Sequence, residues 1–154
     1  MMTNQKTHPI LLAIVVIAFA VSLASCASAQ SRELIKIIQT AIARLNAGDV
    51  DGLMKLYAED AIISDVTGRS VGSQAVRATF QEVVKQGVRL EITKMRVDGN
   101  VVSWTYDVFA GNNKIDTQTA IDVIQDGLII FEGTEASLRY ECSRDPSRAF
   151  CPAK

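Results

Sequence analysis

The chain has 154 residues, enough for one domain with a core of its own and few for two ordinary domains. Sixteen Lys and Arg stand against seventeen Asp and Glu, and the basic residues are scattered along the sequence. Because nucleic-acid-binding domains concentrate positive charge on one face, this composition argues against nucleic acid as a partner and favours a small apolar molecule.

Residues 1–25 have the three-part layout of an export signal. Lys6 gives the segment a positive start, and an apolar run from Ile10 to Leu23 follows, interrupted only by Ser22. The run is shorter than the roughly 20 apolar residues that a membrane-spanning helix needs. We therefore predict a signal peptide, with an uncleaved N-terminal anchor as the alternative.

Two cleavage sites compete after this run. The stretch LASC, ending at Cys26, resembles the bacterial lipobox, and it predicts a lipoprotein anchored through a modified Cys26 with residues 26–30 as a short tether. The stretch ASA at Ala27–Ala29 instead suits an ordinary signal peptidase that cuts before Gln30. The first predicts a membrane-anchored protein on the periplasmic side or cell surface, the second a soluble periplasmic or secreted one.

The remaining cysteines, Cys142 and Cys151, form an even pair in a C-terminal tail, residues 141–154. In an oxidising compartment we predict a disulfide between them, which would stabilise the fold by roughly 2.5 to 3 kcal/mol. Two free thiols or a metal site are the alternatives, and no third Cys or His lies nearby. The only histidine, His8, belongs to the signal segment, and no nucleotide-binding glycine loop occurs. We therefore expect neither metal nor cofactor.

Three helices are predicted in the first half of the domain. The first begins at a Ser31 cap and ends at Gly48; the second is short, capped by Asp49, and carries Tyr57 on its apolar face. The third covers residues 73–87. Between the second and third, residues 61–64 are predicted as a strand and residues 66–72 as a turn.

From Val88 onward, apolar residues recur at every second position instead of every third or fourth. Residues 88–97, 101–109, 114–124 and 128–138 predict four strands joined by three tight glycine turns, an antiparallel meander. The result is one α+β domain over residues 31–140, in which three N-terminal helices fill the concave side of a curved antiparallel sheet. Such a cone leaves a cavity suited to a small ligand.

The stretch LNAGDVDGLMKLYAEDAIISDVTGRSVGSQAVRATF, residues 45–80, resembles the SnoaL-like and nuclear-transport-factor-two-like superfamily, which includes ketosteroid isomerase. The resemblance covers nearly the whole mature chain and implies the cone-shaped fold. It implies much less about function, since members include isomerases, cyclases, hydrolases, dehydratases and noncatalytic modules. It also implies that a homodimer can form through the outer face of the sheet.

The resemblance matches Asp65 to the general base of ketosteroid isomerase. A carboxylate in an apolar cavity has a raised pKa and can remove a proton next to a carbonyl. That isomerase also uses a tyrosine, whose position is Ala41 here, and a protonated aspartic acid. Asp122 lies on the corresponding strand, but alternation groups it with Lys114 and other polar residues, so we predict that it points outward.

Two aromatic residues complete the predicted site. Trp104 and Tyr106 lie on the more apolar face of their strand and are predicted to point into the cone, where Tyr106 can donate to a ligand and Trp104 can stack on it. They can equally serve as core or dimer-interface residues. Tyr57 is a further candidate ligand contact, with packing as its alternative role, and Asp60 is predicted as a capping or turn residue at the end of the second helix.

These features predict an exported domain that binds a small, mostly apolar molecule in its cavity. One alternative is a cofactor-independent isomerase, hydrolase or dehydratase that uses Asp65 as general acid or base. The other alternative is a protein-interaction module that uses the outer face of the sheet.

Overall fold

The computed structural model describes residues 29–64 and 68–151, and one compact unit begins at Leu34. Cys26 and Asp65 lie outside the described residues, so their predicted roles stay predictions. Among the described residues, no helix is long and apolar enough to cross a membrane.

The N-terminal helix occupies residues 29–46 and buries one apolar stripe against the sheet. It is already helical at residues 29 and 30, so the prediction that Ser31 caps it is wrong. Gly48 ends it as predicted, with a φ of 71°. Asn46 joins the helix end to the sheet, because its side chain donates to the Leu90 carbonyl at 2.8 Å and accepts from the Leu90 amide at 2.9 Å.

The second helix, α2 (Val50–Met54), is shorter than predicted. Asp49 caps it, since Gly52 N donates to Asp49 Oδ1 at 2.8 Å. The prediction that Tyr57 lies on this helix is wrong: Tyr57 begins strand β1 (Tyr57–Ser64). Leu56 explains the change, because its carbonyl accepts from Ile129 N at 2.8 Å and draws the chain into the sheet.

The predicted turn after β1 contains a short strand, β2 (Arg69–Val71), which pairs with β1 in antiparallel fashion. The third helix, α3 (Ser73–Lys85), is confirmed and buries Val76 and Phe80. The predicted turn therefore contributes an edge strand to the sheet before α3 begins.

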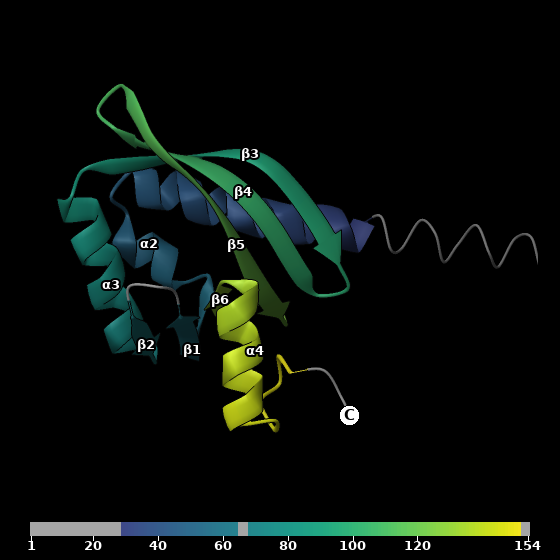
Figure 1. Ribbon diagram of the computed structural model, residues 1–154. Coiled ribbons are helices and arrows are strands. Elements are labelled where there is room, and N and C mark those ends of the chain that lie inside the picture. The colour runs from purple at the N-terminus through teal and green to yellow at the C-terminus, as the bar shows by residue number, and fades with distance from the viewer. Residues whose placement is uncertain (1–28, 65–67, 152–154) are drawn as a thin grey trace, which may run out of the picture. The chain divides into compact units, whose positions relative to one another are not determined.

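The predicted meander is confirmed as β3 (Val88–Asp98), β4 (Val101–Ala110), β5 (Asn113–Gln125) and β6 (Leu128–Gly133). Together with the first two strands it forms a six-stranded sheet in the order β2-β1-β6-β5-β4-β3. Figure 1 shows the long strands β3, β4 and β5 bending together over the helices. The sheet is mixed rather than purely antiparallel, because β1 and β6 run parallel.

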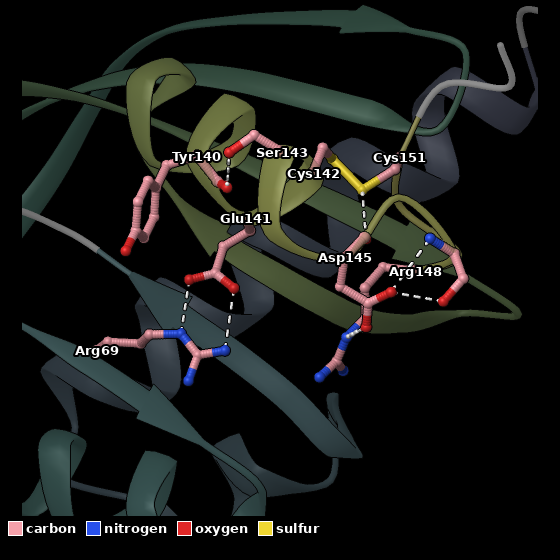
Figure 2. Close-up of a disulfide and its surroundings, with 9 residues drawn as sticks. Arg69, Tyr140, Glu141, Cys142, Ser143, Asp145, Arg148 and Cys151 are labelled. Atoms are coloured by element: carbon pink, nitrogen blue, oxygen red, sulfur yellow. Dashed lines mark hydrogen bonds and ion pairs between the residues drawn. A yellow bond between two sulfur atoms is a disulfide. The ribbon is translucent and has the colours of Figure 1, made fainter.

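A fourth helix, α4 (Glu135–Arg144), was not predicted. The last strand was expected to continue to residue 138, but it ends at Gly133, where Thr134 caps the helix by accepting from Ser137 N at 3.1 Å. The predicted disulfide between Cys142 and Cys151 is confirmed, with a Cα–Cα separation of 5.4 Å (Figure 2). Helix and disulfide together make the C-terminal segment, described to residue 151, part of the compact unit.

The sheet has apolar side chains packed on both faces. The inner face packs against the first three helices, whereas the outer face of β5 and β6 carries a second cluster centred on Phe131. The C-terminal segment covers this second cluster, because Phe150 packs on Phe131 with ring centroids 5.1 Å apart and Leu138 of α4 lies against it. Side chains on either face of β5 can therefore be buried. Burial of Asp122 is thus compatible with a position on the inner face as well as on the outer one.

Candidate functional site

A cleft of about 710 Å³ opens between α3 and the inner face of β3, β4 and β5. It adjoins a small chamber of about 40 Å³, enclosed by the N-terminal helix and the sheet. Both spaces share the side chains of Leu45, Phe80, Leu90, Tyr106 and Glu132. The predicted cavity is thus present, as a wide cleft that narrows to a chamber.

Trp104 and Tyr106 point into this cavity, as their alternation predicted. Trp104 is buried in the inner core, and Tyr106 lines both the cleft and the chamber. Their rings lie 4.5 Å apart between centroids, and the Tyr106 hydroxyl donates to Gln118 Oε1 at 2.9 Å. The two aromatic side chains therefore form one wall at the junction of cleft and chamber.

Tyr57 lines the chamber from the start of β1 rather than from a helix. Its ring meets Phe80 edge-on, with centroids 5.1 Å apart, and its hydroxyl donates to Glu132 Oε2. Burial, and then the negative charge of Glu132, raise the pKa of Tyr57 well above its ordinary value. Asp60 is exposed within β1, so its predicted place at the end of a helix is wrong.

The prediction that Asp122 points outward is wrong. Asp122 is 1% exposed, lines the chamber, and accepts a hydrogen bond from Trp104 Nε1. The apolar residues that alternate with it, Ile121 and Val123, face outward into the second cluster under the C-terminal segment. The more apolar face of β5 is the outer one because that segment covers it.

Glu132 stands directly opposite Asp122 across the β5 and β6 strands. Paired residues in adjacent antiparallel strands project from the same face with their Cβ atoms about 5 Å apart. Both residues line the chamber, so two carboxyl groups meet at its floor.

This environment favours the protonated form of Asp122. Burial, followed by the negative charge of Glu132, raises the pKa of Asp122 well above its ordinary value, although the Trp104 hydrogen bond acts in the opposite direction. A carboxyl group kept neutral can donate a hydrogen bond to a ligand oxygen, and a neighbouring carboxyl can accept one. The chamber floor can therefore bind a polar group or exchange a proton with it.

Sequence reasoning missed Glu132 because of the register of the last hairpin. The tight turn pairs Gln125 with Leu128 and Ile124 with Ile129, but an irregularity then pairs Val123 with Phe131 instead of Ile130. That one-residue shift brings Glu132 opposite Asp122. No feature of the amino-acid pattern announces the irregularity.

The position that the isomerase resemblance assigned to a tyrosine is Ala41, and it lies on the chamber wall with 4% exposure. In this chain a hydroxyl group reaches the chamber from Tyr57 instead.

Comparison with known proteins agrees with this architecture. Residues 38–139 match the model of the SnoaL-like domain. A proposed polyketide cyclase from Sinorhizobium meliloti has a similar structure, with a TM-score of 0.58 and 24% identity over 64% of this chain and 92% of that one.

Two further solved structures share the fold. A proposed ketosteroid isomerase from Kribbella flavida gives a TM-score of 0.60 at 17% identity over 66% of this chain and 76% of that one. An NTF2-like protein from Cytophaga hutchinsonii gives 0.57 at 19% identity over 65% and 86%. At these identities the structures establish the shared fold, and the matched domain establishes the family: the chain belongs to the SnoaL-like domain family.

Proposed function

We propose that the cavity binds a small, mostly apolar molecule whose one polar end reaches the chamber. The observation that carries this proposal is the cleft that narrows onto a mostly apolar chamber with a buried carboxyl group, Asp122. Small-molecule sites combine a largely apolar lining with a few convergent polar groups, and their volumes are about 300 to 1,000 Å³. The volume of the cleft falls within this range, and its lining combines apolar side chains such as Ile63 and Val83 with polar ones such as Gln118.

The dimensions determine how such a ligand lies. The chamber has room for roughly three water-sized groups, which suits a carbonyl, hydroxyl or amino group and excludes a ring. The apolar body of the ligand then occupies the cleft, with Phe80 and Tyr106 at the junction. The carboxyl groups of the chamber contact the polar end of the ligand and the apolar side chains of the cleft contact its body, so the polar end points inward.

Related proteins support a small-molecule ligand rather than a macromolecule. The similar structures include a protein described as a polyketide cyclase and one described as a ketosteroid isomerase. Both descriptions name small carbon-rich compounds as substrates. Because the identities are low, the similarity supports the class of ligand and not a particular compound.

Trp104 gives a direct measurement of binding, because it is the only tryptophan of the chain and lines the chamber. We expect single-ring compounds with one polar end to change its fluorescence. Replacing Ala41 with leucine should weaken this binding by tenfold or more, because the larger side chain occupies part of a chamber of about 40 Å³.

The matched control is Ala43→Leu on the exposed side of the same helix, which should leave binding unchanged. Circular dichroism shows whether each variant is folded. If no compound of such a panel changes Trp104 fluorescence, or if the changes are equal in both variants, the proposed binding site is wrong.

We also propose that the protein is exported and anchored through Cys26. The disulfide supports export, since such bonds persist mainly in oxidising compartments. Mass spectrometry of the mature protein tests the anchor: a diacylated Cys26 at the N-terminus supports it, and an unmodified chain that begins at Gln30 contradicts it.

A further inference from the structure

The charged side chains that line the cavity all have one sign. Four carboxyl groups line the cleft and chamber, from Glu82, Asp116, Asp122 and Glu132. Among the described residues, neither space is lined by Lys, Arg or His. A ligand with a carboxylate or phosphate would therefore enter a negative field without any compensating charge.

Asp122 differs from the other buried carboxyl group of the described chain. Glu141, which is 3% exposed, forms an ion pair with Arg69 at 2.6 Å. Asp122 is more deeply buried, yet it accepts a hydrogen bond from the neutral indole of Trp104, and the side chain opposite it is a second acid, Glu132. Buried carboxyl groups usually have a cation as partner, and no cationic side chain among residues 29–64 and 68–151 lines this chamber.

The aromatic lining supplies the second half of a cation site. Trp104 and Tyr106 stack at the junction of cleft and chamber, and Tyr57 and Phe80 form an edge-to-face pair beside them. Aromatic faces attract cations through their quadrupole, and the attraction increases when the cation is removed from water. The chamber thus joins carboxyl groups and aromatic rings around a space that an ammonium group fits.

We propose that the polar end of the ligand is a protonated amine, held in the chamber against Asp122 and Glu132 and beside the rings of Trp104 and Tyr106. This inference rests on the proposed binding function and specifies the class of ligand: a small apolar amine. Its hydrocarbon body occupies the cleft, and its positive charge lies in a chamber whose charged lining side chains, among the described residues, are both acidic.

Binding of such a cation is linked to a proton. The titratable groups that face Asp122 are Tyr57 on β1, Tyr106 on β4 and Glu132 on β6, whereas the N-terminal helix and β3 contribute only apolar side chains to the chamber. Glu82 on α3 and Asp116 on β5 lie farther out, in the cleft. Since each of these groups is neutral or negative, they favour the protonated form of Asp122, and a bound cation favours release of that proton.

Three compounds of nearly equal shape test the inference: 4-phenylbutylamine, 4-phenylbutan-1-ol and 4-phenylbutyrate. Trp104 fluorescence measures their dissociation constants from the full-length folded protein. We expect the amine to bind roughly tenfold more tightly than the alcohol, and the carboxylate to bind most weakly. Calorimetry near neutral pH, in buffers that differ in ionisation enthalpy, should show a net release of protons with the amine and none with the alcohol.

Two variants distinguish an effect of the chamber on amine binding from an effect of the overall charge of the protein. Glu132→Gln removes one acid of the pair and should reduce the ratio of amine to alcohol affinity about tenfold. Glu91→Gln is the matched control, because Glu91 is half-exposed on β3 next to inward-pointing Leu90 and Ile92, and lines neither space. It should leave the ratio unchanged.

The outcomes distinguish this inference from the function on which it rests. If alcohol and amine bind equally, and Ala41→Leu weakens both, the cavity binds ligands but the inference of a cation is wrong. If none of the three compounds binds, the proposed binding function itself is contradicted. If Glu132→Gln and Glu91→Gln reduce the ratio equally, the preference comes from overall charge and the chamber has no specific role.

Discussion

Replacing Arg69 with alanine is expected to lower the free energy of unfolding by about 3 kcal/mol. Arg69 on β2 binds Glu141 of α4 through two hydrogen bonds, at 2.6 Å and 3.0 Å (Figure 2). Because Glu141 is 3% exposed, the variant leaves a carboxylate buried without its main partner. The Arg69 side chain is 35% exposed, which places the expected loss at the low end of values for buried pairs.

Urea denaturation followed by Trp104 fluorescence measures this loss. Arg77→Ala is the matched control, because the ion pair of Arg77 with Asp51 is exposed and should contribute less than about 1 kcal/mol. If the two substitutions lower the free energy of unfolding equally, the ion pair between β2 and α4 does not stabilise the fold more than an exposed pair does.

The effect of Arg69→Ala should also depend on pH. The hydrogen bonds from Arg69 lower the pKa of Glu141 in the folded protein, so the pair stabilises the fold above the ordinary value of 4.5. This stabilisation is lost as the pH falls through the lower, folded pKa. The difference between wild type and Arg69→Ala should therefore become smaller in acid.

Phe131→Ala should cost about 3 to 5 kcal/mol, the larger of the two effects. Phe131 lies on β6, has no exposed surface, and is the centre of the cluster on the outer face of the sheet. Its ring contacts Phe150, which the neighbouring disulfide holds in place. The substitution leaves a cavity that the C-terminal segment, closed by the disulfide, cannot fill by collapsing.

Thermal and urea unfolding both measure this effect, with Tyr140→Ala as the control. Tyr140 lies on α4, which also carries Leu138 of the same cluster, but Tyr140 is 57% exposed, so its loss should change stability by less than about 0.5 kcal/mol. A cost below about 1 kcal/mol for Phe131→Ala would mean that the C-terminal segment does not cover this face of the sheet in solution.

The parts of the fold that could be predicted are those determined by local pattern. Apolar spacing located the first and third helices, and glycine turns separated the four strands of the meander. The cysteine pair predicted the disulfide that is present. In each case the deciding interactions lie within one or two adjacent elements of the chain.

The parts that could not be predicted depend on contacts between distant segments. Tyr57 leaves the helical pattern because β6, far along the chain, pairs with β1. Asp122 appeared to point outward because alternation identifies two faces of a strand but not which face is inside. Since α4 and Phe150 cover the outer face, the apolar residues of β5 lie there and the polar ones face the cavity. The cap formed by Thr134 and Ser137 was the one local feature that could have revealed α4.

The central claim is that the cavity ends at a buried acid, Asp122, whose surroundings raise its pKa and favour its protonated form in the folded protein. Its most direct test is the pH dependence of the free energy of unfolding of wild type and Asp122→Asn, which keeps an oxygen for Trp104 Nε1. Because the folded pKa of Asp122 is raised above the ordinary 3.8, unfolding releases a proton above that pH, so wild-type stability declines as pH rises toward the folded pKa. Asp122→Asn lacks this decline, so its stability relative to wild type should increase steadily with pH above about 4. Parallel profiles for the two proteins would show that Asp122 ionises normally, and would contradict the claim.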